Sequence, residues 1–277
     1  MSIYIRTTVS SLDAQRNLSA TSRDMSLSFQ RLSSGYRINT AADDAAGLAI
    51  SESMQAQLDS FSVAQRNAND GISMAQTADG AASQVQSILS RMRQLAVQSN
   101  NGDLVTSDRT NLNTEFSTLK SEIDRIANVT KFNNTSLLSG SGNTVSFQVG
   151  IGTSSANDQI AIKFGGVDSS TLGLSTASVD STTNSNTAIT AVDAAISNLA
   201  TAREGFGAGM NRLQYAVSNV ESTIVNLSAA HSRIKDVDVA EETSKLAREQ
   251  VLAQAGAAML AQANQSPQLA LTLLRNA

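Results

Sequence analysis

The longest run of helix-spaced apolar positions lies in residues 45–100. Apolar side chains recur there at steps of three and four residues, averaging roughly 3.5, the period of a helix face that winds around a partner helix. Gly71 and Gly80 interrupt the run and predict a break or bend near 70–80, because glycine weakens a helix. The stripe consists of Ile50, Met54, Leu58, Phe61, Ala64, Ala68, Ile72, Ala75, Ala78, Ala82, Val85, Leu89, Met92 and Ala96.

A helix of this length would extend on the order of 70 Å. It therefore needs a partner of similar length, and the alternative, an ordinary helix buried in a compact bundle, would usually be much shorter. A second stripe of the same period and similar length predicts that partner in residues 189–234. The simplest packing is antiparallel, with a helix over 107–128 as a third member. The second stripe consists of Ile189, Val192, Ile196, Leu199, Ala202, Phe206, Met210, Leu213, Val217, Val220, Ile224, Leu227, His231 and Ile234.

The segment between the two stripes changes from a helical to an alternating pattern. Apolar residues alternate with polar residues or glycine in 145–151 and again in 160–164, with the turn-rich GTSSAND between them. This pattern predicts a β-hairpin at about 144–165. The Ser/Thr-rich residues at about 165–187 have little periodicity and predict an exposed tip.

Weaker apolar seams occupy both ends of the chain. The N-terminal seam has Leu18, Met25, Phe29 and Leu32 as candidate packing residues, and the alanine-rich C-terminal segment has Leu246, Val251, Ala253 and Leu260. Ser266-Pro267 is expected to interrupt the C-terminal helix. Each weak end lacks another partner, so we expect the two end helices to pair with each other. The predicted fold class is mainly α: a long antiparallel helical bundle or coiled coil with a small β-hairpin region and paired N- and C-terminal helices.

Between the first seam and the long stripe, RINTAADDAAG (37–47) contains the beginning of a helix. Asn39 or Thr40 could cap it, and Asp43 and Asp44 would lie in its first turn, where negative charge is favoured. Helix-start chemistry accounts for these two carboxylates without a catalytic role.

Composition narrows the possible partners and compartments. The 277 residues include one Pro, no Cys, no Trp and 4% aromatics, and the net charge is −4. No strong basic run indicates nucleic acid, and no stretch approaches a membrane span. Without cysteine there are no disulfides or thiolate metal sites, and the N-terminus lacks the apolar run of a secretory signal. Taken alone, these features favour a cytosolic protein.

The sequence predicts no enzyme, metal site or cofactor. The single histidine, His231, falls on the second stripe, which indicates a stacked or hydrogen-bonded core residue rather than a ligand. HExxH is missing, and no nucleophile has a histidine base nearby in sequence. GFGAG (205–209) lacks the Lys-Ser/Thr of a phosphate-binding loop.

Several long motifs resemble bacterial flagellin, in the right order and over essentially the whole chain apart from 165–187. They are RLSSGYRINTAADDAAGLAISE (31–52), QRNANDGISMAQTADGA (65–81), RMRQLAVQSNNG (91–102), FNNTSLL (132–138), FQVGIG (147–152) and SRIKDVDVAEETSKLAREQVLAQAGAAMLAQANQSPQLALTLLR (232–275). The chain resembles a short flagellin that lacks the large variable outer domains. Departures such as His231 and the final Asn276-Ala277 are modest.

The resemblance implies a structural subunit of the bacterial flagellar filament, used for motility. It implies export through the flagellar type III apparatus without a cleaved signal, and hence a secreted, extracellular location. By this resemblance, residues 1–44 and 236–277 form an inner coiled-coil domain and residues 45–235 an outer one. The implied partners are other copies of the chain, an export chaperone, the export apparatus, and the filament cap and hook-junction proteins.

Three alternatives remain beside flagellin. A hook–filament junction protein would share flagellin-like ends, and a secreted enzyme on a flagellin scaffold would need an inserted domain longer than 165–187. An intracellular signalling rod would not need the hairpin.

The resemblance also implies candidates for recognition by the vertebrate flagellin-sensing Toll-like receptor. They are Arg91, Leu95 and Glu115, and we expect Leu95 to be partly exposed because it lies just off the apolar stripe. The alternative role for these residues is filament packing. The Ser/Thr-rich run 168–187 is either a site of O-linked glycans or a solvated loop.

Overall fold

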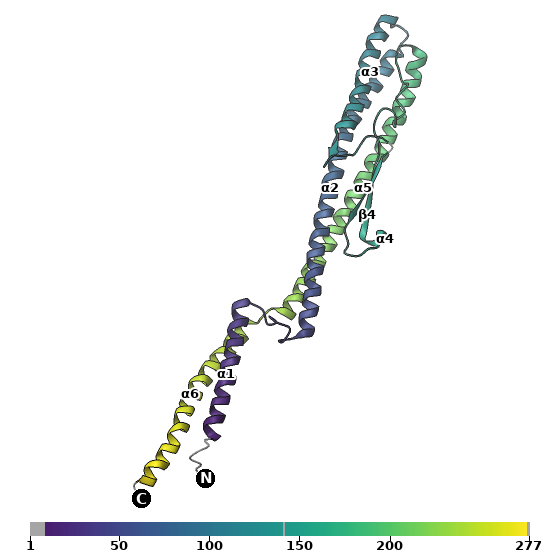
Figure 1. Cartoon of the computed structure of the whole chain (residues 1–277). Coiled ribbons are helices and arrows are strands. Elements are labelled where there is room, and N and C mark those ends of the chain that lie inside the picture. The colour runs from purple at the N-terminus through teal and green to yellow at the C-terminus, as the bar shows by residue number, and fades with distance from the viewer. Residues whose placement is uncertain (1–8, 141, 276–277) are drawn as a thin grey trace. The chain divides into compact units, whose positions relative to one another are not determined.

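The computed structural model describes residues 9–140 and 142–275, and of residues 266–275 it describes the backbone alone. Its long helices and small strand pairs confirm the predicted fold class (Figure 1). The helices are α1 (Val9–Ser34), α2 (Ala45–Ser99), α3 (Thr106–Val129), the single turn α4 (Ser155–Asp158), α5 (Thr182–Lys235) and α6 (Val239–Arg275). The strands are β1 (Lys131–Phe132), β2 (Thr135–Ser136), β3 (Asn143–Gln148) and β4 (Gln159–Phe164).

The chain divides into two compact units. The terminal unit comprises residues 1–56 and 226–277, and the central unit comprises residues 57–225. The long helices α2 and α5 each contribute to both units.

In the central unit α2 and α5 lie side by side and antiparallel (Figure 1). Arg93 of α2 pairs with Asp193 of α5 at 2.6 Å, and Asp79 of α2 pairs with Arg203 of α5 at 2.7 Å. Rising numbers on α2 meet falling numbers on α5, which confirms the predicted antiparallel pairing. The side chains of the two stripes fill the core between them, together with Phe116 and Ile123 of α3.

Of the break or bend predicted near 70–80, the break is wrong, because α2 is one continuous helix. Close packing accounts for the glycine at position 71. Gly71 is buried, and a Cβ atom there would lie 2.8 Å from Leu213 Cδ1. The cost of glycine to the helix is of order 1 kcal/mol, which tertiary packing along a long helix offsets.

The predicted β-hairpin is confirmed. Strands β3 and β4 pair antiparallel, with Val145 opposite Ile162 and Phe147 opposite Ile160. The hairpin packs on the helices through Phe164, whose ring centroid is 5.7 Å from that of Phe206 on α5.

The exposed tip predicted at 165–187 is wrong. Helix α5 already begins at Thr182, and Val167, Leu172, Leu174 and Val179 are buried in the core of the central unit. The sequence pattern did not predict their burial, because residues 165–181 are neither helix nor strand and their apolar side chains have no regular spacing. Polar contacts hold it to α3: Asp124 accepts hydrogen bonds from the Ser169 backbone N–H and hydroxyl, both at 2.8 Å.

In the terminal unit α1 and α6 lie side by side and antiparallel, as predicted (Figure 1). The Ser11 hydroxyl donates to Asn264 Oδ1 at 2.8 Å near one end of the pair, and Arg31 lies 3.9 Å from Glu242 near the other. The predicted interruption at Ser266-Pro267 is wrong, because α6 continues to Arg275.

The residue that caps α2 differs from the two predicted. Asp44 Oδ1 accepts a hydrogen bond from the Gly47 N–H at 2.8 Å, so Asp44 supplies the cap. Asp43 turns back to the preceding loop, where it accepts from the backbone N–H groups of Asn39 and Thr40. These bonds hold the pKa of Asp43 below its ordinary value, chiefly through Thr40.

Candidate functional site

The surface of the terminal unit is the first candidate site, because its helices leave large apolar side chains in solvent. Within the described part of α1 the only buried residue is Ser28, so no large apolar side chain of that helix is fully covered. Leu12 and Phe29 of α1 are about half exposed, and Val251 and Met259 of α6 are 64% and 66% exposed. Two helices alone cannot bury both of their apolar faces, and exposed patches of this kind mark interaction surfaces.

The predicted packing residues of these helices separate into two groups. Leu18, Met25, Leu32, Leu246, Ala253 and Leu260 are partly buried, whereas Phe29 and Val251 face solvent. Leu18 packs near Gly256, where a Cβ atom would lie 3.5 Å from Leu18 Cδ1. Phe29 and Val251 therefore contribute little to the contact between α1 and α6, and both are available to another surface.

A charged cluster ties the base of this helix pair together, and the sequence reading missed it. Glu242 is only 3% exposed and lies within 4 Å of Arg31 and Lys245, and Arg31 also approaches Asp43 at 3.9 Å. The heptad spacing from Val239 to Leu246 could have revealed Glu242, because position 242 falls on the same helix face.

A backbone clasp beside this cluster was also missed. Tyr36 and Asp236 form an isolated antiparallel bridge, with Arg37 N donating to Lys235 O at 2.7 Å. The Lys235 ammonium lies 5.2 Å from the centre of the Tyr36 ring and 3.0 Å from Glu52. The clasp fixes the point where the chain leaves α1 against the point where it enters α6.

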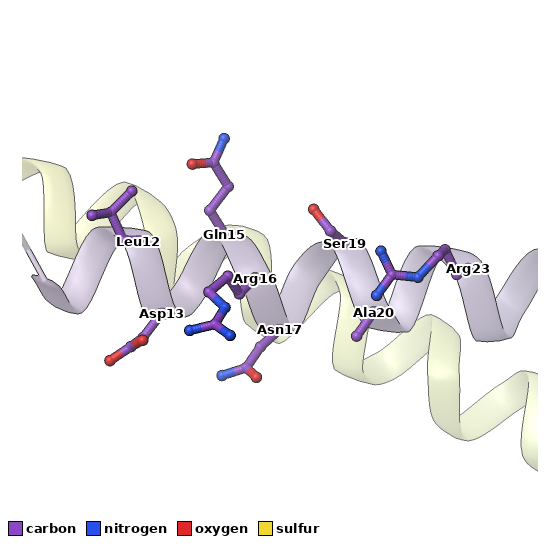
Figure 2. Close-up of a pocket in the computed structure, with 8 residues that line it drawn as sticks. All are labelled: Leu12, Asp13, Gln15, Arg16, Asn17, Ser19, Ala20 and Arg23. Atoms are coloured by element: carbon purple, nitrogen blue, oxygen red, sulfur yellow. The ribbon is translucent and has the colours of Figure 1, made fainter.

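The outer face of α1 carries a shallow, mainly polar hollow (Figure 2). Arg16 and Arg23 lie along it with Asp13 and Asn17. All of its lining residues come from α1, namely Leu12, Asp13, Gln15, Arg16, Asn17, Ser19, Ala20 and Arg23. An open hollow on one helix does not enclose a small molecule, and it adds a polar border to the exposed apolar residues of the terminal unit.

The groove between α2 and α3 in the central unit is the second candidate site. Arg91 of α2 and Glu115 of α3 are brought together at 2.8 Å, and each side chain is about half exposed. Further along, Arg125 pairs with Glu122 at 2.6 Å, and its hydrogen bond lowers the pKa of Glu122. The groove floor includes Ile88, Leu119 and Ile126.

The expected exposure of Leu95 is wrong, because its side chain is fully buried. Leu95 belongs to the core of the central unit, to which α3 contributes Phe116 and Ile123. Arg91 and Glu115 can therefore contact a partner directly. Leu95 can contribute only indirectly, by packing in the core that supports α2 and α3.

His231 is partly buried, and its Nε2 atom has no hydrogen-bond partner among the described residues. Within the described chain no group of three or more His, Cys, Asp or Glu side chains could hold a metal ion. No described helix is both long and apolar enough to cross a membrane.

Long paired helices that leave large apolar side chains in solvent are typical of a structural protein that binds other chains. Similarity to known protein sequences identifies the family. The sequence model of the bacterial flagellin N-terminal helical region matches residues 5–143, and that of the C-terminal helical region matches residues 189–274. The chain therefore belongs to the bacterial flagellin family.

Individual relatives agree with this assignment. The chain is 45% identical to a flagellin of Halalkalibacterium halodurans over 266 residues, covering 95% of this chain and 97% of that protein. It is 39% identical to the flagellar filament 33 kDa core protein of Treponema phagedenis over 286 residues, covering 99% of this chain and all of that protein. Family membership makes it a structural subunit of the flagellar filament, and a hook–filament junction protein is not favoured.

Two solved structures are also similar. The crystal structure of Bacillus cereus flagellin matches with a TM-score of 0.51 and 33% identity, over 60% of this chain and 94% of that one. A flagellar hook-associated protein from Vibrio parahaemolyticus matches with a TM-score of 0.56 over 70% of this chain and all of that one, at 14% identity. At that identity the second match shows a shared fold and nothing about function.

Proposed function

We propose that α1 and α6 drive assembly of the filament by burying their exposed apolar residues against other copies of the chain. In this arrangement residues 1–44 and 236–277 form the inner domain and residues 45–235 the outer one. The observation that carries the proposal is the exposure of Val251 and Met259 on a helix whose partner covers only its other side. Burying each side chain of this size contributes roughly 1.5–3 kcal/mol, and the contribution repeats at every subunit.

Seeded polymerisation tests this proposal. Val251→Glu places a charge on the exposed face without disturbing the subunit, because the side chain is 64% exposed. We expect the variant to keep its circular dichroism spectrum and to fail to elongate filament seeds. Val251→Leu is the matched control, since it keeps the position apolar, and it should elongate. Normal elongation of Val251→Glu would contradict a role for this face.

We also propose that the subunit, as a member of this family, is exported and is located outside the cell. Its partners on that route are an export chaperone, the type III export apparatus, and the cap and hook-junction proteins. A cell-fractionation experiment tests this. The chain should be found in the sheared filament fraction of a motile strain and be retained inside an otherwise identical strain without the export apparatus.

The exposed pair of Arg91 and Glu115 supports a second function, recognition by the vertebrate flagellin-sensing Toll-like receptor. Arg91 lines a groove with an apolar floor and pairs with Glu115, an arrangement that suits a protein contact with charged anchors. Leu95 supports this site from beneath. Receptor binding and filament packing compete for this surface in our proposal.

A receptor reporter assay on monomeric protein tests recognition. Arg91→Ala should lower the response, and Arg93→Ala should not. Arg93 is the matched control because it forms an ion pair of similar exposure with Asp193, away from Glu115. An exposed ion pair contributes at most about 1 kcal/mol to stability, so both variants should melt close to the parent. Equal responses from both variants would remove Arg91 from the proposed site.

A further inference from the structure

The turn between α2 and α3 holds the only Asn–Gly step in the chain, Asn101–Gly102. Both residues are exposed, and nothing lies within 4 Å of the position where a Cβ atom of Gly102 would be. Among the described residues, neither the Asn101 carboxamide nor the Gly102 N–H has a hydrogen-bond partner. The side chain and the next backbone nitrogen are therefore both free to approach each other.

Arg109 acts on the same peptide unit. Its Nη2 donates a hydrogen bond to the Asn101 carbonyl oxygen at 2.8 Å, while its Nε donates to Ser99 O at 3.0 Å. The nitrogen of Gly102 is conjugated with that carbonyl. A cationic donor on the oxygen draws electron density from the peptide and makes the Gly102 N–H more acidic, which favours the nucleophilic form of the nitrogen.

We propose that Asn101 is a site of spontaneous deamidation, promoted by Arg109, with isoaspartate as its favoured product. The Gly102 nitrogen loses its proton to solvent and attacks Cγ of Asn101. A C–N bond forms, the bond from Cγ to the carboxamide nitrogen breaks, and ammonia leaves. Water then opens the cyclic imide at one of its two carbonyls, so the balance is one water consumed and one ammonia released.

The position of Arg109 decides between the two products. When water attacks the former backbone carbonyl, the chain continues through Cγ and that carbonyl becomes a free carboxylate. This is the group to which Arg109 already donates, so the new negative charge gains a charge-assisted hydrogen bond. Opening at Cγ instead leaves an ordinary aspartate, whose new carboxylate is not the group that Arg109 contacts.

Other Asp and Asn residues of the chain that could react in this way are held by hydrogen bonds or ion pairs. Asp70–Gly71 and Asp79–Gly80 lie inside α2, where the glycine nitrogens belong to the helical hydrogen-bond ladder. Asp79 is also engaged by Arg203 at 2.7 Å. The neighbouring Asn100 donates from its carboxamide to Asn186 at 2.9 Å. These positions serve as internal controls in the same molecule.

Peptide mapping by mass spectrometry, after incubation of the full chain at mildly alkaline pH, tests the proposal. The deamidated product should accumulate at Asn101 and not at Asn100. It should form faster as the pH is raised. Gly102→Ala should slow the reaction roughly tenfold, because a Cβ atom restricts the approach. The turn tolerates this variant since there is open space at the site. No modification at Asn101, or an equal rate in Gly102→Ala, would overturn the assignment of the site.

The role of Arg109 has a separate readout in the ratio of isoaspartate to aspartate. The native chain should give a higher ratio than the same chain incubated in urea, where the hydrogen bond to Arg109 is lost. Native Arg109→Gln should give a ratio close to that of the denatured chain. Equal ratios in native and denatured chains would overturn the part assigned to Arg109.

Discussion

Gly71 on α2 lies directly against Phe147 on β3: a Cβ atom at position 71 would be 3.0 Å from the Phe147 ring. Gly209 on α5 has the same relationship to Ile162 on β4, at 2.7 Å. The hairpin therefore lies against a glycine on each of the two long helices. These two glycines let the strands approach the helices more closely than any other residue would allow.

Gly71→Ala should destabilise the chain by about 1–3 kcal/mol, because an added methyl group overpacks this contact by more than alanine gains in helix propensity. Gly80→Ala is the matched control in the same helix. Nothing lies within 4 Å of its Cβ position, so it should stabilise by about 0.5–1 kcal/mol. Chemical denaturation of both variants measures the difference. If Gly71→Ala were the more stable of the two, the close approach of the hairpin would be refuted.

Leu95→Ala should cost about 2–5 kcal/mol, since it leaves a cavity in the core of the central unit. Val97→Ala, two positions along the same helix, should cost much less because Val97 is 50% exposed. Thermal unfolding of the two variants checks this. A small effect of Leu95→Ala would mean that the side chain is not enclosed in the core, and direct contact with a receptor would again be possible.

The loop before α2 should lose support from Asp43 in acid. The folded pKa of Asp43 is lowered, so its contribution is fully present above the unfolded value near 3.9 and is lost as pH falls through the folded value. Asp43→Asn should therefore speed amide exchange at Asn39 and Thr40 at neutral pH and match the parent in strong acid. A difference in amide exchange rate between variant and parent that grew as the pH fell would contradict this prediction.

The helices of the terminal unit should gain protection when filaments form. Amide exchange in the described parts of α1 and α6 should slow markedly on polymerisation, because neighbouring subunits then cover their exposed apolar residues. The buried stretch of α2 around Leu89 and Met92 should be protected in both states and serves as the reference. Strong protection of α1 and α6 in the free subunit would show that these helices need no partner. Residues 1–8 lie outside the described part of the chain.

Periodicity along the chain determined the helices and their pairing. Stripes with a period near 3.5 and of matching length predicted the pairing of α2 with α5, and strict alternation predicted the hairpin. Both patterns can be detected in the sequence because they mark the apolar face of a single element. The family followed from long motifs in sequence order. Arg91 and Glu115 were expected in one site, and the structure places them 2.8 Å apart.

Tertiary structure alone decided which faces are covered. Leu95 is buried in a core to which α3 contributes Phe116 and Ile123. Gly71 lies in a continuous helix against the Phe147 ring, and Leu174 is buried within a polar segment. The charge cluster of Arg31 and Glu242 likewise joins residues from opposite ends of the sequence. Local patterns report which side of an element is apolar, but the burial of a given side chain depends on elements that approach from elsewhere in the chain.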